Sequence, residues 1–385
     1  MKNFRLFVLS SLLASSAIAA DLGDADRMLV KSLLDISQSR MVSALSTLDQ
    51  IIEKHPNFRL AQLIKGDLLL AHARPLSTLG NARPSSELDD LRQEARQRVR
   101  ALSDPLQEDK LPRYLLDLGD SYRHALVVDA SRSRLYVFEN RAGLPVRVAD
   151  YYVTVGKAGL GKQKEGDNRT PIGIYSVSGF KPGSELGDFY GRGAFTLSYP
   201  NEWDQRLGRS GHGIWIHGTP SNTYSRAPRA SEGCVVLANE DMKTLGQFIQ
   251  TGKTPVIIAE QVDWVDHDKL DASRGELSAA VDQWRKDWES LDTTRLLENY
   301  SQSFRSESLN YSQFSQAKQR NNAAKEWVKL GLSNVSLMLY PERPGLAVVS
   351  FTQDYRSNNL SDLMRKRQFW SRENGRWKII HETQL

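Results

Sequence analysis

Residues 214–237, IWIHGTPSNTYSRAPRASEGCVVL, contain two short apolar segments separated by a loop rich in Ser, Pro and Arg. Each apolar segment predicts a β-strand, and the 11 residues 220–230 return the chain from the first to the second. The first strand ends in His217, and the second begins at Cys234, the single cysteine among 385 residues. Two strand ends joined in this way can bring the imidazole beside the thiol.

Cys234 is a candidate nucleophile. A cysteine attacks a carbonyl only as the thiolate, and an imidazole within hydrogen-bond reach lowers its pKa and carries its proton. Gly233 lets the backbone turn tightly before Cys234, which leaves nearby amides free to hold the oxyanion of a tetrahedral intermediate. The alternative is a small buried hydrophobic residue, the commoner state of a lone cysteine. A disulfide within the chain is excluded, because there is no second cysteine.

The first twenty residues, MKNFRLFVLSSLLASSAIAA, place Lys2 and Arg5 before an apolar run and a small-residue stretch. This pattern predicts a secretory signal peptide over residues 1–20 and therefore an exported, periplasmic protein. No later apolar run reaches membrane-spanning length, so we expect no transmembrane segment in the mature chain. The formal charge of +5 falls to +3 when Lys2 and Arg5 leave, which is too small and too dispersed to indicate nucleic-acid binding.

Residues 21–115 are expected to form a helical region. Apolar side chains such as Leu45, Leu48 and Ile52 recur at spacings of three and four. One unit resembles a tetratricopeptide repeat, but no second copy follows at a period of about 34 residues. A helical hairpin that packs on its neighbour is the simpler expectation, with residues 73–87 as a loop.

From residue 122 the apolar period changes to two. Many short strands with Gly and Pro between them predict a compact β domain over residues 122–262. One helix is expected near its end, where Asn239 could act as the N-cap. The polar stretch at 260–276, EQVDWVDHDKLDASRGE, marks the next boundary.

Residues 275–385 are expected to form a third, α+β domain. An amphipathic helix carries Trp284 and Trp288 on one face, and the strands that follow include a hairpin across residues 373–375. These tryptophans are expected in the hydrophobic core. The whole chain is therefore predicted to be a multidomain α+β protein.

One glycine-rich segment has the spacing of a phosphate-binding loop. Gly156, Gly161 and Lys162 follow a predicted strand, but Gln163 stands where a Ser or Thr would bind magnesium. The next residues cannot continue a helix, so we expect no nucleotide.

A metal site is also not expected. His212 and His217 are five apart on a predicted strand, so their side chains should point to opposite faces. Cys234 and His217 alone are too few ligands for zinc. The sequence therefore predicts neither a metal nor a cofactor.

The HG pair at 217–218, followed after a loop by SEGC at 231–234, resembles the hallmark of the L,D-transpeptidase (YkuD-type) family of bacterial cell-wall enzymes. TVGKAGLGKQKEGDNRTPIGIY is similar to the family's Gly-Lys and Thr-Pro-x-Gly segments, and LSYPNEWD, which contains Tyr199, to its Tyr-Pro-Asn segment. The resemblance covers about residues 122–262.

The resemblance implies a role for each matching residue. Cys234 would be the nucleophile and His217 the proton acceptor and donor, while the carbonyl of Gly218 orients the imidazole. Ser231 and Gly233 would shape the loop. Enzymes of this family attack the carbonyl of the third stem-peptide residue, usually meso-diaminopimelate, and expel D-Ala. Transfer to an amine acceptor gives a transpeptidase, and transfer to water gives an L,D-carboxypeptidase.

One position departs from the family. Val236 stands two residues after the cysteine, where an Arg that binds an anionic peptide group is common. Arg226 and Arg229 in the preceding loop are candidates to replace it, although both fit solvated loop charges equally well. Tyr199 completes the substrate-side candidates, and His212 is expected to be structural.

The order of regions resembles that of the cell-shape-determining L,D-carboxypeptidases of helical bacteria. The closing FWSRENGRWKIIHE resembles a nuclear-transport-factor-like cone, for which we expect substrate or partner binding. The implied partners are peptidoglycan stem peptides, with the helical region as a candidate docking site for a protein partner. Two other hypotheses remain: a catalytically silent wall-binding scaffold and an unrelated cysteine protease.

Overall fold

The computed structural model describes residues 24–385 apart from 74, 76–77, 81–84 and 307. The chain divides into two compact units. The first extends to residue 107 and also takes in 126–137 and 147–261; the second comprises 108–125, 138–146 and 262–385. The predicted signal peptide and part of the predicted loop at 73–87 lie outside the described residues.

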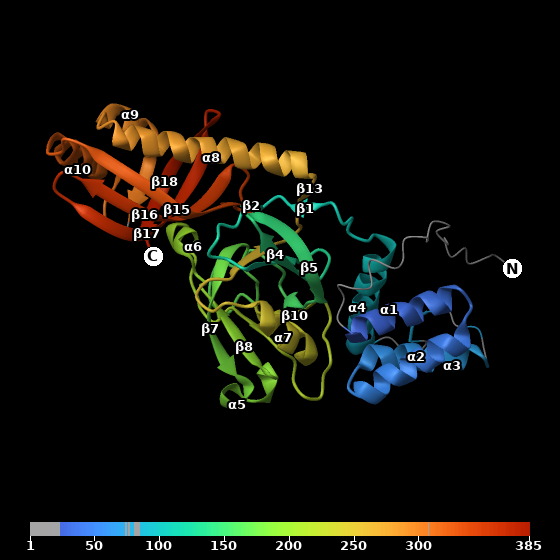
Figure 1. Ribbon diagram of the computed structural model, residues 1–385. Helices are drawn as coiled ribbons and strands as arrows, with labels where there is room; N and C mark the ends of the chain where they lie inside the picture. The colour runs from blue at the N-terminus through green and yellow to red at the C-terminus, as the bar shows by residue number, and fades with distance from the viewer. Residues whose placement is uncertain (1–23, 74, 76–77, 81–84, 307) are drawn as a thin grey trace. The chain divides into compact units, whose positions relative to one another are not determined.

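Among the described residues of the N-terminal region, the first unit contains four helices, labelled α1 to α4 in Figure 1. They are α1 (Asp24–Ser37), α2 (Met41–Lys54), α3 (Arg59–Ala71) and α4 (Ser86–Ser103). The apolar residues at helical spacing are those that become buried, including Leu29, Leu48 and Ile64. Ser85 caps α4 by accepting a hydrogen bond from the amide of Leu88 at 3.2 Å. The helical N-terminal region expected from the sequence is confirmed.

The end of the expected helical region differs from the prediction. Residues 111–117 form two short strands, β1 (Leu111–Pro112) and β2 (Leu115–Asp117), in the second unit. Pro105 and Pro112 interrupt helical hydrogen bonding, and Leu111 and Leu115 pair with other strands instead. β1 pairs with β13 (Trp264–Val265), and β2 pairs with the C-terminal sheet.

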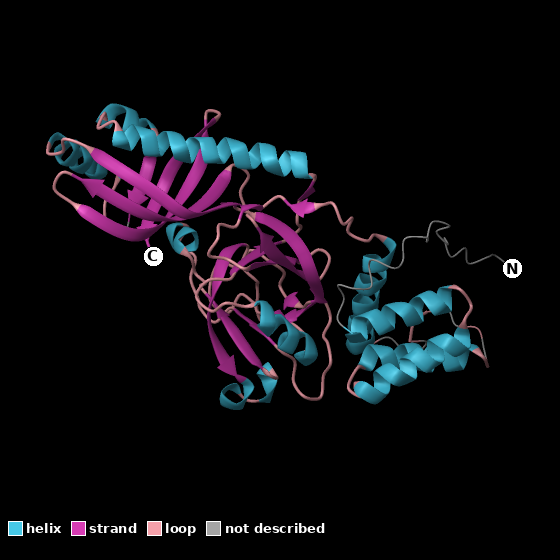
Figure 2. Ribbon diagram, viewed as in Figure 1, coloured by secondary structure: helices cyan, strands magenta, loops and turns pink. Residues whose placement is uncertain are grey.

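The middle of the chain forms an eight-stranded sheet in the order β11-β9-β8-β7-β12-β3-β4-β5 (Figures 1 and 2). Its strands are β3 (His124–Asp129), β4 (Arg134–Arg141), β5 (Leu144–Tyr152), β7 (Gly173–Pro182), β8 (Gly193–Leu197), β9 (Trp215–His217), β11 (Val235–Val236) and β12 (Pro255–Ala259). A parallel pair, β6 (Val155–Gly156) and β10 (Arg229–Ser231), lies outside this sheet. The change to a period of two therefore correctly predicted a β-rich domain.

Short helices connect the strands of the middle domain. They are α5 (Gly183–Leu186), α6 (Glu202–Arg206), α7 (Asn239–Leu245) and the 3-10 helices η2 (Asp188–Tyr190) and η3 (Gly246–Phe248). The residue at the N-cap of α7 is Ala238, and no side chain caps this helix. The expected cap by Asn239 is wrong, because its amide makes tertiary hydrogen bonds instead.

The C-terminal domain packs helices on a six-stranded sheet in the order β14-β18-β17-β16-β15-β2 (Figure 2). Its elements are α8 (His267–Glu289), α9 (Thr293–Glu298), β14 (Tyr300–Ser306), α10 (Tyr311–Ala323), β15 (Val328–Leu339), β16 (Leu346–Ser357), β17 (Ser361–Glu373) and β18 (Arg376–Gln384). Trp284 and Trp288 of α8 are both buried, with ring centroids 5.4 Å apart. The multidomain α+β prediction is confirmed.

Two local features of this domain relate to the sequence. Asn374 and Gly375 adopt positive φ angles of 50° and 79° between β17 and β18, so the hairpin expected across residues 373–375 is confirmed. The polar stretch at 260–276 contains the start of α8, at His267. Asp268 in the first turn of this helix complements the helix dipole.

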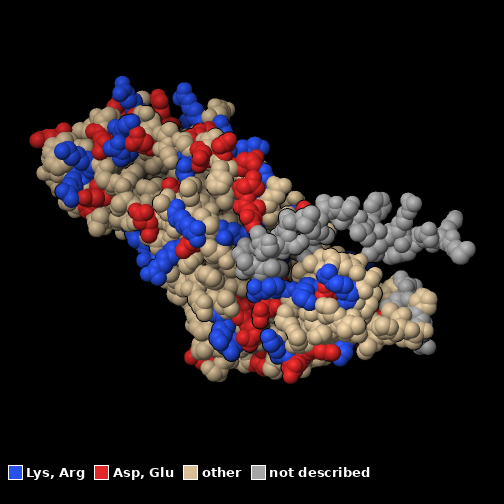
Figure 3. Space-filling view, turned by 45° about the vertical axis from the view of Figure 1, so that its right-hand side comes forward, with Lys and Arg blue, Asp and Glu red and all other residues tan. Residues whose placement is uncertain are grey.

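The distribution of surface charges agrees with the small formal net charge of the chain. In Figure 3, acidic and basic side chains are interspersed on the visible face rather than segregated by sign. None of the described helices combines the length and the apolar composition needed to cross a membrane.

Candidate active site

Two adjacent parallel strands position His217 and Cys234. β9 and β11 pair with Val235 opposite Ile216 and Val236 opposite His217. One residue earlier in the same register, Cys234 stands beside Trp215. Cys234 directly precedes β11, and the Trp215 amide hydrogen-bonds to its thiol, so Cys234 and His217 lie at neighbouring positions of adjacent strands. The structure thus brings together the two residues that the sequence singled out.

His217 is held in one orientation and in its neutral form. Its side chain is buried, and Nδ1 lies 2.7 Å from the carbonyl oxygen of Gly218. That carbonyl can only accept, so Nδ1 carries the proton and Nε2 presents a lone pair. Burial lowers the pKa of His217 to about 4. The nearby charge of Arg226 also lowers this pKa, whereas the hydrogen bond to Gly218 raises it. The imidazole is therefore a neutral base at pH 7.

The thiol of Cys234 is protonated at rest. Burial raises its pKa to about 11, although a hydrogen bond from the Trp215 amide and the charges of Lys162 and Arg226 favour the thiolate. Sγ lies 3.4 Å from the carbonyl oxygen of Gly213, as a weak donor. Both side chains are therefore neutral at rest, and a thiol in this state could attack a carbonyl only by losing its proton as the bond forms.

The turn before Cys234 is fixed by Ser231 and Gly233. The Ser231 hydroxyl donates to the Cys234 carbonyl at 2.6 Å and accepts from the Gly233 amide at 3.1 Å. Gly233 has φ of 127°, and an added Cβ would lie 2.8 Å from the carbonyl oxygen of Arg169. Only glycine tolerates both conditions, so residue 233 sets the backbone from which the thiol projects.

A single hydroxyl links this turn to the Gly-Lys and Thr-Pro-x-Gly segments. Thr170 donates to the Gly233 carbonyl at 2.8 Å and accepts from the Gly156 amide at 2.9 Å, and it is fully buried. Gly156 has no room for a side chain, since a Cβ would meet the carbonyl oxygen of Asn168 at 2.5 Å. The segments that carried the resemblance therefore support the backbone turn before Cys234.

The segment that follows the glycine-rich loop is held together by the carboxylate of Asp167. Lys162 is buried and pairs with Asp167 at 2.8 Å. The same carboxylate accepts hydrogen bonds from the amides of Gln163, Lys164 and Arg169. Lys162 and these three amides are therefore already paired with a carboxylate.

Aromatic rings that the sequence analysis did not single out surround the imidazole. Tyr190 and Phe189 of η2 lie 5.1 Å and 5.8 Å from the His217 ring, centroid to centroid. Tyr190 also contacts Trp215, at 5.2 Å. Phe189 is 49% exposed, so this wall faces solvent. The only sequence signal was an aromatic pair between glycines, in GDFYGRG.

The two candidate arginines occupy different places. The Arg226 guanidinium carbon lies 5.0 Å from the centroid of Phe189, and its charge influences the pKa of both His217 and Cys234. Arg226 is half-buried and forms no ion pair with any residue that the structure describes. Arg229 is exposed on β10. Arg226 therefore supplies an unpaired cation beside the reacting pair.

Val236 offers no charge at the site. It is buried, pairs with His217 across the strands, and exchanges backbone hydrogen bonds with Thr154 at 2.9 and 3.0 Å. An aliphatic side chain fits this position because the position is buried.

Two other candidates are placed away from the thiol. Tyr199 is buried in the hydrophobic core of the β domain, and its hydroxyl donates to the Ser210 carbonyl at 3.0 Å. Its expected place on the substrate side is therefore corrected to the core. His212 lies in an exposed loop before β9, 3.6 Å from Glu165, and not on the strand where we expected it. Several nearby glycines prevent the strand from starting earlier.

Asn239 is the further polar residue that sequence reasoning placed wrongly. Its amide donates to the Thr219 carbonyl at 2.7 Å and accepts from the Arg192 amide at 3.0 Å. Its Oδ1 would lie 2.1 Å from a Cβ added to Gly218 and to Gly191 alike. Asn239 therefore fixes the turn that follows the imidazole, and this turn requires glycine.

The C-terminal domain contains a separate buried polar cluster. Lys366 pairs with Glu382 at 2.8 Å, and Gln368 donates to the same carboxylate. Burial and the charge of Lys366 lower the pKa of Lys318 to about 7, and its Nζ lies 3.5 Å from the centroid of Trp288. Among the described residues, no group of His, Cys, Asp and Glu could hold a metal ion.

Comparison with known proteins gives two family matches and several structural neighbours. Residues 123–258 match the L,D-transpeptidase catalytic domain family (YkuD), and residues 276–383 match the Cds6 C-terminal NTF2-like domain. The structure of Bd1075 from Bdellovibrio bacteriovorus is similar with a TM-score of 0.65 and 29% identity, covering 72% of this chain and 98% of that one.

The helical cell shape determining protein Pgp2 from Campylobacter jejuni is similar with a TM-score of 0.60 and 26% identity, covering 70% of this chain and 95% of that one. No curated protein sequence matches the chain.

Proposed function

We propose that Cys234 cleaves stem peptides through an acyl-enzyme, because residues 123–258 match the catalytic domain of the L,D-transpeptidase family. The observation that carries this proposal is the neutral, oriented imidazole of His217, at the end of the strand that pairs with the segment directly after Cys234. The bond attacked is the one between diaminopimelate and D-Ala, the donor bond that the family resemblance implies. The polymer lies outside the inner membrane, which supports a periplasmic location.

The acylation half-reaction uses only the groups described. Nε2 of His217 takes the Sγ proton as sulfur attacks the diaminopimelate carbonyl, and the carbon–sulfur bond forms. The imidazolium then gives that proton to the departing D-Ala nitrogen, and the carbon–nitrogen bond breaks. A thioester on Cys234 and free D-Ala result.

The second half-reaction decides the product. An amine acceptor loses its proton to Nε2 of His217 and attacks the thioester, which gives a new peptide bond and restores the thiol. This transpeptidase reaction is the first candidate. Water in the place of the amine gives an L,D-carboxypeptidase, which trims tetrapeptide to tripeptide. The similarity to a cell shape determining protein favours this second candidate.

Arg226 is proposed to bind the anionic group of the donor peptide. Its guanidinium is unpaired among the described residues and close to both reacting side chains. A guanidinium binds a carboxylate through charge-assisted hydrogen bonds, often two in parallel. Arg226 would thereby replace the Arg that the family commonly has at the position of Val236.

The test is product analysis with disaccharide tetrapeptide. We expect the purified protein to release D-Ala, and Cys234→Ala and His217→Gln to lose at least about a thousandfold in rate, because nucleophile and base are removed. His212→Gln is the matched control and should keep wild-type activity. Release of D-Ala with addition of water identifies the carboxypeptidase, and cross-linked dimers identify the transpeptidase. Turnover that is equal in the Cys234→Ala variant would overturn the proposal.

A further inference from the structure

The loop at 218–230, which follows the catalytic imidazole and carries Arg226, docks on the N-terminal helices. Tyr224 is buried in the same hydrophobic cluster as the cores of α1, α2 and α3. Its ring stacks on Phe58, with centroids 4.3 Å apart and planes at 28°, and contacts His55 at 4.8 Å. Tyr224 is therefore a residue of the β domain whose side chain packs in the hydrophobic core of the helices, and it attaches the loop to them.

Backbone contacts reinforce this docking. The Tyr224 amide donates to the Asn57 carbonyl at 3.3 Å, and the Asn57 side-chain amide donates to the Ser221 carbonyl at 2.9 Å. Asn57 lies in the short turn between α2 and α3. One turn of the helical region thus holds the loop at two points.

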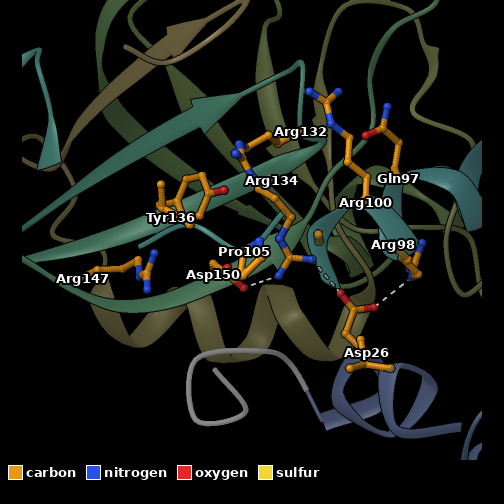
Figure 4. Close-up of a pocket in the computed structure, with 13 residues that line it drawn as sticks. Asp26, Gln97, Arg98, Arg100, Pro105, Arg132, Arg134, Tyr136, Arg147 and Asp150 are labelled. Atoms are coloured by element: carbon orange, nitrogen blue, oxygen red, sulfur yellow. Dashed lines mark hydrogen bonds and ion pairs between the residues drawn. The ribbon is translucent and has the colours of Figure 1, made fainter. Parts of the chain in front are cut away.

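A buried ionic network fixes the other side of the loop. The Ser225 hydroxyl donates to Glu94 of α4 at 2.5 Å, and Glu94 pairs with Arg98 at 2.7 Å. Figure 4 shows how Asp26 of α1 then lies between Arg98 and Arg134 of β4, at 3.1 and 3.0 Å. These charges are almost inaccessible to solvent, so each is tied to its partner and the network has one arrangement.

The contacts converge on the backbone of Arg226. Its carbonyl accepts from the Tyr152 hydroxyl at 2.9 Å and from Thr154 at 3.2 Å. The guanidinium of Arg98 lies 3.9 Å from the centroid of the Tyr152 ring. With its main chain held there, the Arg226 side chain extends to Phe189 beside the imidazole.

We propose that the N-terminal helical region is a clamp within the chain that sets the position of Arg226, and with it the recognition of the carboxylate of the donor peptide. This proposal rests on the proposed function. Tyr224 and Ser225 are the positioning residues, and Arg226 is the residue that contacts substrate. A long loop of Ser, Pro and Arg has little order of its own, so the guanidinium acquires a fixed place through the helices.

The first test needs no substrate. Iodoacetate and iodoacetamide both alkylate Cys234, but only iodoacetate carries a carboxylate, so the ratio of their rates reports a cation beside the thiol. We expect Arg226→Gln to lower this ratio about fivefold, the effect of one partly solvated charge at short range. Tyr224→Ala and Ser225→Ala should each lower it about threefold. Tyr224→Phe, which keeps the stacked ring, should retain the wild-type ratio.

Ser221→Ala is the matched control for Ser225→Ala. Both substitutions remove one hydroxyl from the same loop, but Ser221 is exposed and only its backbone contacts the helical region. We expect the wild-type ratio for Ser221→Ala. Thermal melting of each variant shows that it is folded.

The second readout is kinetic. With disaccharide tetrapeptide we expect Tyr224→Ala and Ser225→Ala to raise KM about tenfold and to change kcat less than about twofold, because binding of the carboxylate is lost and the reacting pair is intact. The clamp is overturned if Arg226→Gln lowers the alkylation ratio and Tyr224→Ala and Ser225→Ala do not. The proposed function fails separately if the wild-type protein shows no turnover that depends on Cys234. In that case the alkylation ratio still tests the clamp.

Discussion

In the proposed reaction, His217 and Cys234 start without charge. With pKa values of about 4 for the imidazole and about 11 for the thiol, moving the proton between them in the resting enzyme costs on the order of 10 kcal/mol. The thiolate therefore forms only as its electron pair passes to the substrate carbonyl. A neutral thiol is less prone to adventitious oxidation, since reactivity follows thiolate character.

The pH dependence of alkylation tests this resting state. Alkylation of the free enzyme by iodoacetamide should rise with pH toward about 11 and show no plateau between about pH 5 and 8, because little thiolate exists below the raised pKa. The acid limb of kcat/KM should fall near pH 4, where the base His217 becomes protonated. Mass spectrometry and initial rates give the two profiles. A plateau at pH 5 to 8 that His217→Gln abolishes would instead indicate a thiolate–imidazolium pair.

At the scale of elements, the catalytic turn depends on segments distant in the chain. β6 and the residues near 170 support the strand end at 231–234 through the Thr170 hydroxyl. The helix α7 supports the turn after His217 through Asn239. These contacts explain why the Gly-Lys and Thr-Pro-x-Gly segments accompany the catalytic residues, although neither carries a reacting group.

Thr170→Val tests this support. Valine matches threonine in shape but leaves the Gly156 amide and the Gly233 carbonyl without their buried partner, so we expect a loss of about 2–4 kcal/mol in the free energy of unfolding. Activity should fall as well, because the turn before Cys234 loses its anchor. Urea denaturation measures the stability, with Thr251→Val at an exposed turn as the control. A change below about 0.5 kcal/mol would show that the two groups find other partners.

At the scale of the whole first unit, a buried ionic joint connects the helical region to the β domain. Burial alone would raise the pKa of Asp26, but Arg98 and Arg134 outweigh it and hold that pKa below the usual 3.8. Arg134 also pairs with Asp150. Buried pairs of this kind add little net stability over an apolar contact, yet they permit one docking geometry.

Asp26→Asn tests the joint. We expect a loss of about 3–5 kcal/mol at pH 7, because two buried guanidinium groups lose a shared carboxylate. Asp24→Asn, at an exposed position of the same helix, should change stability by less than about 1 kcal/mol. Urea denaturation at several pH values makes the comparison. A small effect of Asp26→Asn at pH 7 would contradict the joint.

The sign of the pH effect follows from the lowered pKa of Asp26. The stabilisation by its pairing is complete above about pH 3.8, the unfolded value, and disappears as the pH falls through the lower folded pKa. The difference between wild type and Asp26→Asn should therefore shrink below about pH 3.8. A difference that stays constant into strong acid would mean that the carboxylate is not the stabilising species.

The sequence by itself determined the class of each region and predicted the proposed nucleophile and base. His217, Gly233 and Cys234 lie within one stretch, and the turn at 374–375 and the buried face of α8 follow from residues a few positions apart. Such features depend on local backbone preference and apolar periodicity, which a sequence displays directly.

Only the tertiary structure decided which residues surround that pair. Tyr199 belongs to the core and Arg226 to the site, while Asn239 supports a turn instead of capping a helix. Tyr224 meets Phe58 more than 160 positions earlier in the chain. Contacts between such distant residues are selected by the joint packing of strands and helices, and no local pattern encodes which face a loop will meet.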